Sequence, residues 1–202
     1  MPKVKSREYR ALDILRPAEK EKRIDSNYYV EGYATTFEPY ELYEFDGVKY
    51  YEQIDRNALI DADLSDVIMQ YDHEGRVLAR QSNKSLIVET TDDGLFICAD
   101  LGGSSASKEM YEDISSGLVT KMSWAFTVAE DSYDRETRTR TILKVKKVYD
   151  VSAVSIPANN DTDINARSYF DGVIKEEQQE LLKRKKQALK IKHALAMEEI
   201  YK

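Results

Sequence analysis

The chain has 202 residues, of which 42% are hydrophobic, enough for one globular core and an appendage. It has no run of roughly 20 apolar residues such as crosses a bilayer. Residues 1–5 lack the apolar segment of a secretory signal. We therefore expect a soluble, intracellular protein with no membrane partner. Its only cysteine, Cys98, excludes an internal disulfide and a cysteine-rich metal site, and its apolar neighbours favour a buried structural thiol.

The net charge of −7 is unevenly distributed along the chain. Residues 1–23 carry a net +4 and residues 171–202 a net +2, which leaves −13 on residues 24–170. An acidic body does not favour nucleic-acid binding, because phosphate contacts need clustered positive charge. The basic ends are either solvated tails or contacts for an acidic partner, and the sequence leaves both interpretations open.

The first 25 residues are charged and follow no sustained hydrophobic period, which predicts a partly ordered basic arm. From Tyr28 the chain changes to short segments rich in aromatic and β-branched residues, which predict strands. The turn sequences Asp46-Gly47 and Asp92-Asp93-Gly94 indicate two hairpins. The predicted strands cover residues 28–34, 66–71, 85–90 and 95–99, with a hairpin over residues 40–51.

A helix is predicted next. Ser104 or Ser105 can cap its N-terminus, and Gly117 can end it in the left-handed conformation. The apolar face of this helix is formed by Met110, Tyr111 and Ile114.

Residues 121–130 alternate between large apolar and small side chains, which is the period of a half-buried strand. We expect the large side chains to anchor the strand and the small face to leave room for a substrate. The large face consists of Met122, Trp124, Phe126 and Val128, and the small face of Ser123, Ala125 and Thr127. Residues 131–140 predict a hairpin tip, and residues 141–156 predict a long return strand closed by Pro157.

Residues 172–201 contain no proline and no glycine after Gly172, and their composition predicts a long amphipathic helix. Apolar residues recur at seven-residue intervals between positions 181 and 196, but Lys185 and Lys192 interrupt the stripe. Two roles of this helix remain open: its apolar stripe can pack on the body, or it can bind a partner helix.

Chemistry that needs a metal or a phosphate cradle is poorly supported, and we expect no metal and no cofactor. Asp61, Asp63 and Asp66 lack EF-hand spacing and are interpreted as solvated or helix-capping residues. Residues 102–105 lack the lysine of a P-loop and predict a hinge with a helix cap. His193 lies among lysines in the tail and is interpreted as a solvated surface residue.

His73, Ser123 and Asp150 remain as candidates for nucleophilic catalysis. His73 follows the strand at residues 66–71, and we expect it at a strand-to-loop junction, where functional groups concentrate. Asp150 is an acidic residue in an apolar run, so its burial requires a partner such as a histidine. A serine nucleophile needs a base within hydrogen-bond reach. From the residues alone, a structural histidine and ordinary small-residue packing at Ser123 are the simpler interpretations.

Several ordered blocks of the sequence resemble the prohead, or head maturation, proteases of tailed phages, which are distantly similar in fold to the herpesvirus assembly proteases. The resemblance covers about residues 28–167. Its blocks are residues 31–37 (EGYATTF), 51–59 (YEQIDRNAL), 72–80 (DHEGRVLAR), 92–95 (DDGL), 114–126 (ISSGLVTKMSWAF) and 149–159 (YDVSAVSIPAN).

The resemblance implies an α+β, mainly β fold: a small closed or nearly closed β-barrel flanked by helices, followed by the long C-terminal helix. It implies that His73 is the general base, Ser123 the nucleophile and Asp150 the group that orients the imidazole. Family members often carry glycine where Ala79 and Ala125 stand, and glutamate where Asp150 stands. Backbone N–H groups near the Gly117 turn are candidates for the oxyanion hole.

The implied organisation is a basic arm over residues 1–25, a protease domain over residues 26–168 and a helical tail over residues 169–202. The implied activity is a serine endopeptidase that cuts the scaffolding region of the major capsid protein and itself. We therefore expect the major capsid protein or its scaffolding region as partner, and self-association as a dimer. The expected location is the host cytoplasm, inside the assembling procapsid.

Two other interpretations remain. In the first, the chain has the same fold but is a non-catalytic capsid assembly or scaffolding protein, which suits the basic ends and the long helix. In the second, it is a β-barrel binding module with no phage role, which would need neither the histidine block nor the serine block.

Overall fold

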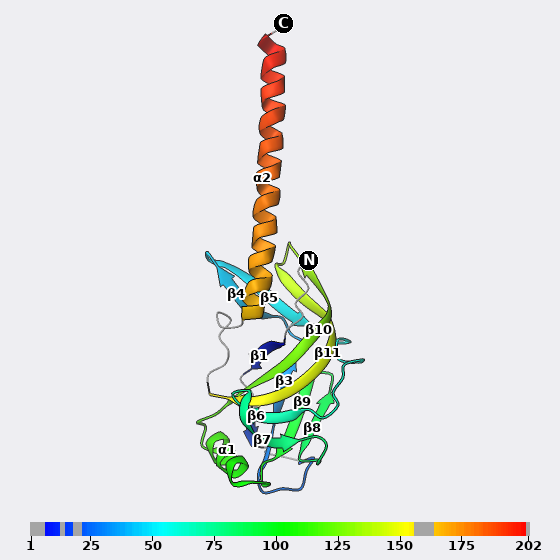
Figure 1. Ribbon diagram of the computed structural model, residues 1–202, viewed down its shortest axis with the longest axis vertical. Coiled ribbons are helices and arrows are strands. Elements are labelled where there is room, and N and C mark those ends of the chain that lie inside the picture. Colours follow the sequence, from blue (N-terminus) through cyan, green and yellow to red (C-terminus); the bar gives the residue numbers. More distant parts are fainter. Residues whose placement is uncertain (1–6, 13–14, 18–21, 156–163, 201–202) are drawn as a thin grey trace.

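The computed structural model describes residues 7–12, 15–17, 22–155 and 164–200, and the described chain is mainly β with two helices (Figure 1). The first sheet contains β1 (Glu8–Leu12), β4 (Tyr40–Phe45), β5 (Val48–Ile54), β6 (Ile68–Tyr71), β7 (Glu74–Arg80), β10 (Lys121–Asp134) and β11 (Thr139–Val154). The second contains β2 (Leu15–Pro17), β3 (Tyr29–Thr36), β8 (Leu86–Thr90) and β9 (Gly94–Asp100). The helices are α1 (Ser105–Ser115) and α2 (Ile164–Ile200).

The strands do not close into a barrel, so the barrel implied by the family resemblance is wrong for the described residues. The first sheet runs in the order β1-β10-β11-β5-β4, and the second in the order β2-β3-β9-β8. The long β11 pairs in parallel with β5 along its first part and with β6, which in turn pairs with β7, along its last part. Because no ladder among the described residues joins the two sheets, they form a layered pair with open edges.

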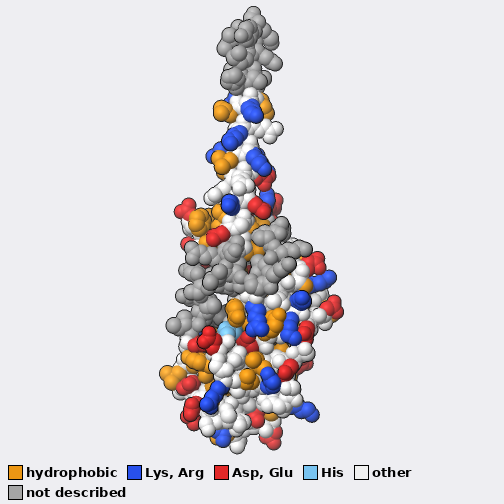
Figure 2. All heavy atoms as spheres, in the orientation of Figure 1, with side chains coloured by type: hydrophobic (Ala, Val, Ile, Leu, Met, Phe, Trp, Pro, Cys, Tyr) orange, Lys and Arg blue, Asp and Glu red, His pale blue; other side chains and the backbone are white. Residues whose placement is uncertain are grey.

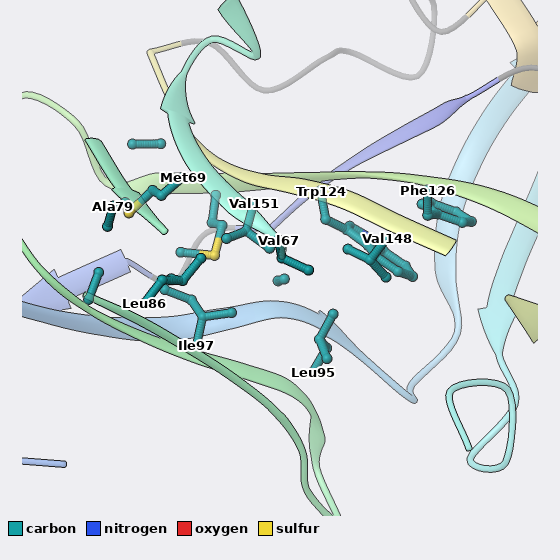
Figure 3. Packing of buried hydrophobic residues seen from close by; sticks show 14 of the residues in the cluster. Val67, Met69, Ala79, Leu86, Leu95, Ile97, Trp124, Phe126, Val148 and Val151 are labelled. Carbon is teal, nitrogen blue, oxygen red and sulfur yellow. The ribbon is translucent and has the colours of Figure 1, made fainter. Parts of the chain in front are cut away.

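The main hydrophobic core lies where the two sheets meet. Met69 and Val151 from the first sheet face Leu86 and Ile97 from the second (Figure 3). Burying each side chain of this size contributes roughly 1.5–3 kcal/mol. The large face of β10 anchors it as predicted, and the rings of Trp124 and Phe126 stack with centroids 3.9 Å apart. Cys98 is buried, as its neighbours indicated.

Helix α1 begins and ends as the sequence predicts. The side chain of Ser104 accepts a hydrogen bond from the backbone N–H of Ser107, which is the N-cap contact. At the other end Gly117 has φ +77°, and the N–H groups of Gly117 and Leu118 donate to the carbonyls of Ile114 and Asp113. This pattern is a Schellman motif, which needs a left-handed residue at the glycine position.

The glycine at the β8–β9 turn is required by a close backbone approach. Gly94 has φ +156°, and a Cβ added there would lie 2.0 Å from the carbonyl oxygen of Thr35 on β3. Glycine therefore lets β9 pass against β3 at this point, in addition to forming the predicted turn.

A buried network of charges, which the sequence did not predict, ties β1 to the rest of the first sheet. The guanidinium of Arg10 contacts Glu52 at 2.5 and 2.9 Å and Glu8 at 2.6 Å. The guanidinium of Arg140 contacts Glu8 at 2.7 and 3.0 Å, Glu52 at 3.1 Å and Asp131 at 2.9 Å. Burial favours the neutral acid at Glu52, but the two arginines outweigh it and lower the pKa of Glu52.

We expect Arg140→Met to destabilise the fold by about 3–5 kcal/mol, because it leaves buried carboxylates with one guanidinium in place of two. Chemical denaturation monitored by circular dichroism measures the change. Lys144→Met is the matched control: Lys144 lies on the same strand but pairs with Glu130 at an exposed site, where loss of the pair costs less than about 1 kcal/mol. Equal losses for the two variants would contradict a stabilising role for the buried network.

Helix α2 contacts the body through its first half, from an apolar cluster near its beginning to an ion pair between Glu180 and Arg135. Tyr169, Phe170 and Val173 are buried in a second apolar cluster, and the Phe170 ring stacks on Tyr43 with centroids 5.9 Å apart. The other members of this cluster come from the β4–β5 hairpin and include Leu42 and Tyr50. Arg140 also places its guanidinium 4.2 Å from the Tyr169 ring centroid, so the charge network extends to the helix.

Beyond its docked turns, α2 projects away from the body as a single long rod (Figure 1). Every side chain from residue 181 to residue 192 is exposed, including Leu181, Leu182, Leu189 and Ile191. Among the described residues, no helix is both long enough and apolar enough to cross a membrane.

Candidate active site

The turn that carries His73 is tighter than the sequence indicated. Tyr71 of β6 pairs directly with Glu74 of β7, so Asp72 and His73 are the two central residues of a hairpin. Both have positive φ, 47° and 60°, which is the conformation of a type I′ turn. The predicted strand-to-loop junction is therefore corrected to a two-residue turn. Asp72 and His73 take the place of the Asn-Gly pair that is usual in such turns, so His73 has a left-handed backbone conformation.

Asp72 fastens this turn to the end of β11. Its backbone N–H donates to the carbonyl of Ala153 at 2.9 Å. Its carboxylate accepts hydrogen bonds from the N–H and the hydroxyl of Ser155, each at 3.1 Å. These contacts offset the strain of two non-glycine residues at positive φ and fix the position from which the imidazole projects.

The pairing of β10 with β11 places the other two predicted residues on one face of the sheet. Ser123 lies opposite Ser152, and Ala125 lies opposite Asp150. Since paired residues of an antiparallel ladder share a face, Ser123 and Asp150 are diagonal neighbours on it. The parallel pairing of β6 with β11 brings the His73 turn to the same place.

The structure brings all three sequence-predicted residues into one hydrogen-bonded chain. His73 Nδ1 lies 2.5 Å from Asp150 Oδ1, and His73 Nε2 lies 2.7 Å from Ser123 Oγ. A carboxylate only accepts, so with Asp150 ionised Nδ1 must carry the proton. In the neutral ring Nε2 then accepts from the Ser123 hydroxyl, and this tautomer is the one in which the histidine can take the serine proton.

Ser152 is a fourth member that sequence reasoning missed. Its hydroxyl donates to Asp150 Oδ1 at 2.8 Å, and it is fully buried. The Asp150 side chain is only 5% exposed, so the hydrogen bonds from His73 and Ser152 compensate its loss of water. The sequence could have indicated this role, because Ser152 follows Asp150 by two residues and residues two apart on a strand share a face.

The small face of β10 is covered more completely than we expected. Ser123 is 1% exposed, whereas the side chain of His73 is 17% exposed. The turn carrying His73 folds over the face that was predicted to stand open, and the imidazole itself covers the hydroxyl. Figure 2 shows a histidine side chain, in pale blue, reaching the surface of the body beside acidic and apolar groups.

The amides of the Gly117 turn do not form the oxyanion hole that was suggested for them. The N–H groups of Ser116, Gly117, Leu118 and Val119 all donate to carbonyls of α1. They are already used in ending the helix, so none is directed at the Ser123 hydroxyl in this structure.

The acidic residues before β6 form a surface cluster. Asp63 contacts Lys147 and Ser65, and Asp66 contacts Ser82 and, at 3.6 Å, Arg80. The interpretation as solvated residues is confirmed, because Asp61, Asp63 and Asp66 are all exposed. Across the described segments, no group of three or more histidine, cysteine or acidic side chains is placed to hold a metal ion. The side chain of His193 lies outside the described residues.

A serine hydroxyl bonded to an imidazole, which is bonded in turn to a buried carboxylate, is the arrangement of serine hydrolases. A model of the caudovirus prohead serine protease family matches residues 16–180 of the chain. The match covers most of the chain, which therefore belongs to this family. No curated protein and no solved structure matches it.

Proposed function

We propose that the chain is an active prohead maturation protease, a serine endopeptidase with Ser123 as nucleophile, His73 as general base and Asp150 as the orienting acid. The observation that carries the proposal is the pair of contacts at His73, 2.7 Å to Ser123 Oγ and 2.5 Å to Asp150 Oδ1, in a member of the prohead protease family.

In the proposed reaction Ser123 Oγ attacks the carbonyl carbon of a peptide bond, and its proton passes to His73 Nε2. The C–N bond then breaks, and the imidazolium gives that proton to the departing amine. A water molecule next loses a proton to His73 and attacks the acyl-serine ester, which releases the acid product and returns the proton to Ser123. Asp150 keeps the imidazole in the required tautomer and stabilises its charged form.

The proposed substrates are the scaffolding region of the major capsid protein and the protease itself, inside the assembling procapsid in the host cytoplasm. The experiment is to follow purified full-length protein by intact mass over time, alone and with capsid protein that carries its scaffolding region. A fluorophosphonate probe and peptide mapping locate the reactive serine. We expect specific fragments and a label on Ser123. The absence of both would favour the alternative, a non-catalytic assembly protein of the same fold.

We further propose that the projecting part of α2, residues 181–200, binds an acidic amphipathic helix of the scaffolding region. Between residues 181 and 192 it carries Lys183, Arg184, Lys185, Lys186, Lys190 and Lys192, no acidic residue, and the exposed apolar side chains described above. The family match ends at residue 180, so this segment lies beyond the matched residues. Basic charge beside apolar side chains complements an acidic helix with an apolar stripe.

Deleting residues 181–202 is expected to reduce incorporation of the protease into proheads at least tenfold, while cleavage of a soluble peptide stays unchanged. Quantitative immunoblots of purified proheads measure incorporation. Full-length protein with Lys183, Lys186 and Lys190 changed to glutamate should lose incorporation in the same way, because the charge complementarity is reversed. Normal incorporation of both variants would refute the proposal, and light scattering of each variant tests whether the helix instead forms a dimer.

A further inference from the structure

Strand β1 lies beside the strand that carries Ser123. Its residues Tyr9 and Ala11 pair with Ala125 and Ser123, so the side chain of Tyr9 belongs to the face that holds the three proposed catalytic residues. The Tyr9 ring contacts the imidazole of His73 directly, with ring centroids 4.7 Å apart and planes inclined by 70°. β1 precedes the residues that the family model matches, and nothing in the match assigns it a role.

We infer that Tyr9 is a positioning residue for His73 and that β1 is part of the active site. The inference rests on the proposed catalytic role of His73. The two hydrogen bonds of the imidazole fix the line through its nitrogens but leave the ring free to tilt about that line. A neighbouring aromatic ring in a T-shaped contact removes this freedom.

The opposite face of β1 explains how Tyr9 is held in place. Glu8 and Arg10, the residues on either side of it, point to that face and join the buried charge network with Glu52 and Arg140. Glu8 is 0% and Arg10 4% exposed. A strand fixed by buried ion pairs on one face presents its other face rigidly, so Tyr9 contacts His73 from a defined position.

The test compares Tyr9→Leu with Tyr9→Phe, which keeps the ring. Tyr9→Leu should lower kcat roughly three- to tenfold with KM unchanged, since only the orientation of the imidazole is lost. Tyr9→Phe keeps the ring contact and should restore kcat to within about twofold. Tyr33→Leu is the matched control: Tyr33 is half-buried and makes a similar T-shaped contact with Phe96, in the second sheet. It should leave kcat unchanged.

A second readout is independent of activity. The chain has two histidines, so the ring resonances of His73 can be assigned by comparison with a His193→Gln variant, in a Ser123→Ala background that prevents self-cleavage. Tyr9→Leu should shift the His73 ring signals, and Tyr33→Leu should not. Unshifted signals in Tyr9→Leu would overturn the inference, as would equal kcat for Tyr9→Leu and the wild type. Shifted signals in a protein that cleaves nothing would keep the positioning role and refute the proposed function.

Discussion

Replacing Ser123 by alanine is expected to abolish cleavage of the capsid scaffolding region and of the chain itself. Loss of the nucleophile in a serine protease lowers kcat by about 10⁶, and the residual rate would be undetectable by intact mass. The fold should be preserved, because Ser123 is buried with one hydrogen bond to His73 and alanine fills nearly the same volume. Intact mass over time, with a thermal melt of each protein, measures both.

Ser132→Ala is the matched control for this prediction. Ser132 lies on the same strand, β10, but is exposed and away from the His73 turn, so cleavage should proceed at the wild-type rate. If Ser123→Ala still labels with the fluorophosphonate and cuts at the wild-type rate, the nucleophile is another residue. If wild type and Ser123→Ala yield the same fragments without labelling, the cleavage comes from a contaminating protease.

The second large effect is expected at Asp150. Asp150→Asn should lower kcat by about 10⁴, because the amide can donate to His73 Nδ1 and so favour the tautomer that cannot accept the serine proton. Asp150→Glu retains a carboxylate and should keep more activity than Asp150→Asn. Asp92→Asn, an exposed change of the same kind, should have no effect. Steady-state kinetics on a scaffold peptide separate these outcomes, and full activity of Asp150→Asn would remove Asp150 from the proposed mechanism.

The sequence predicted those elements whose local residue pattern matches the burial and turn geometry that they have in the folded protein. The alternation of Met122, Trp124 and Phe126 indicated the anchoring face of β10, and Ser104 with Gly117 marked the ends of α1. The three proposed catalytic residues were identified because blocks of family resemblance surrounded them. The residues alone favoured a structural role, since their proximity depends on pairings between strands distant in the sequence.

The features that were missed are those set by long-range pairing. Nothing in the local sequence around Glu8 and Arg10 indicates that they meet Glu52 and Arg140 in the interior, so the segment was interpreted as part of a basic arm. The role of Tyr9 was missed for the same reason. The barrel was inferred from the family, whereas its absence depends on how strand edges pair, which no local pattern specifies.

The position of β10 inside its sheet determines how a polypeptide can reach Ser123. β1 occupies one edge of β10 from Met122 to Phe126, and β11 occupies the other. An incoming chain therefore cannot extend the sheet by forming a ladder with the nucleophile strand, because both rows of main-chain groups are already paired. It must cross above the sheet, past the imidazole.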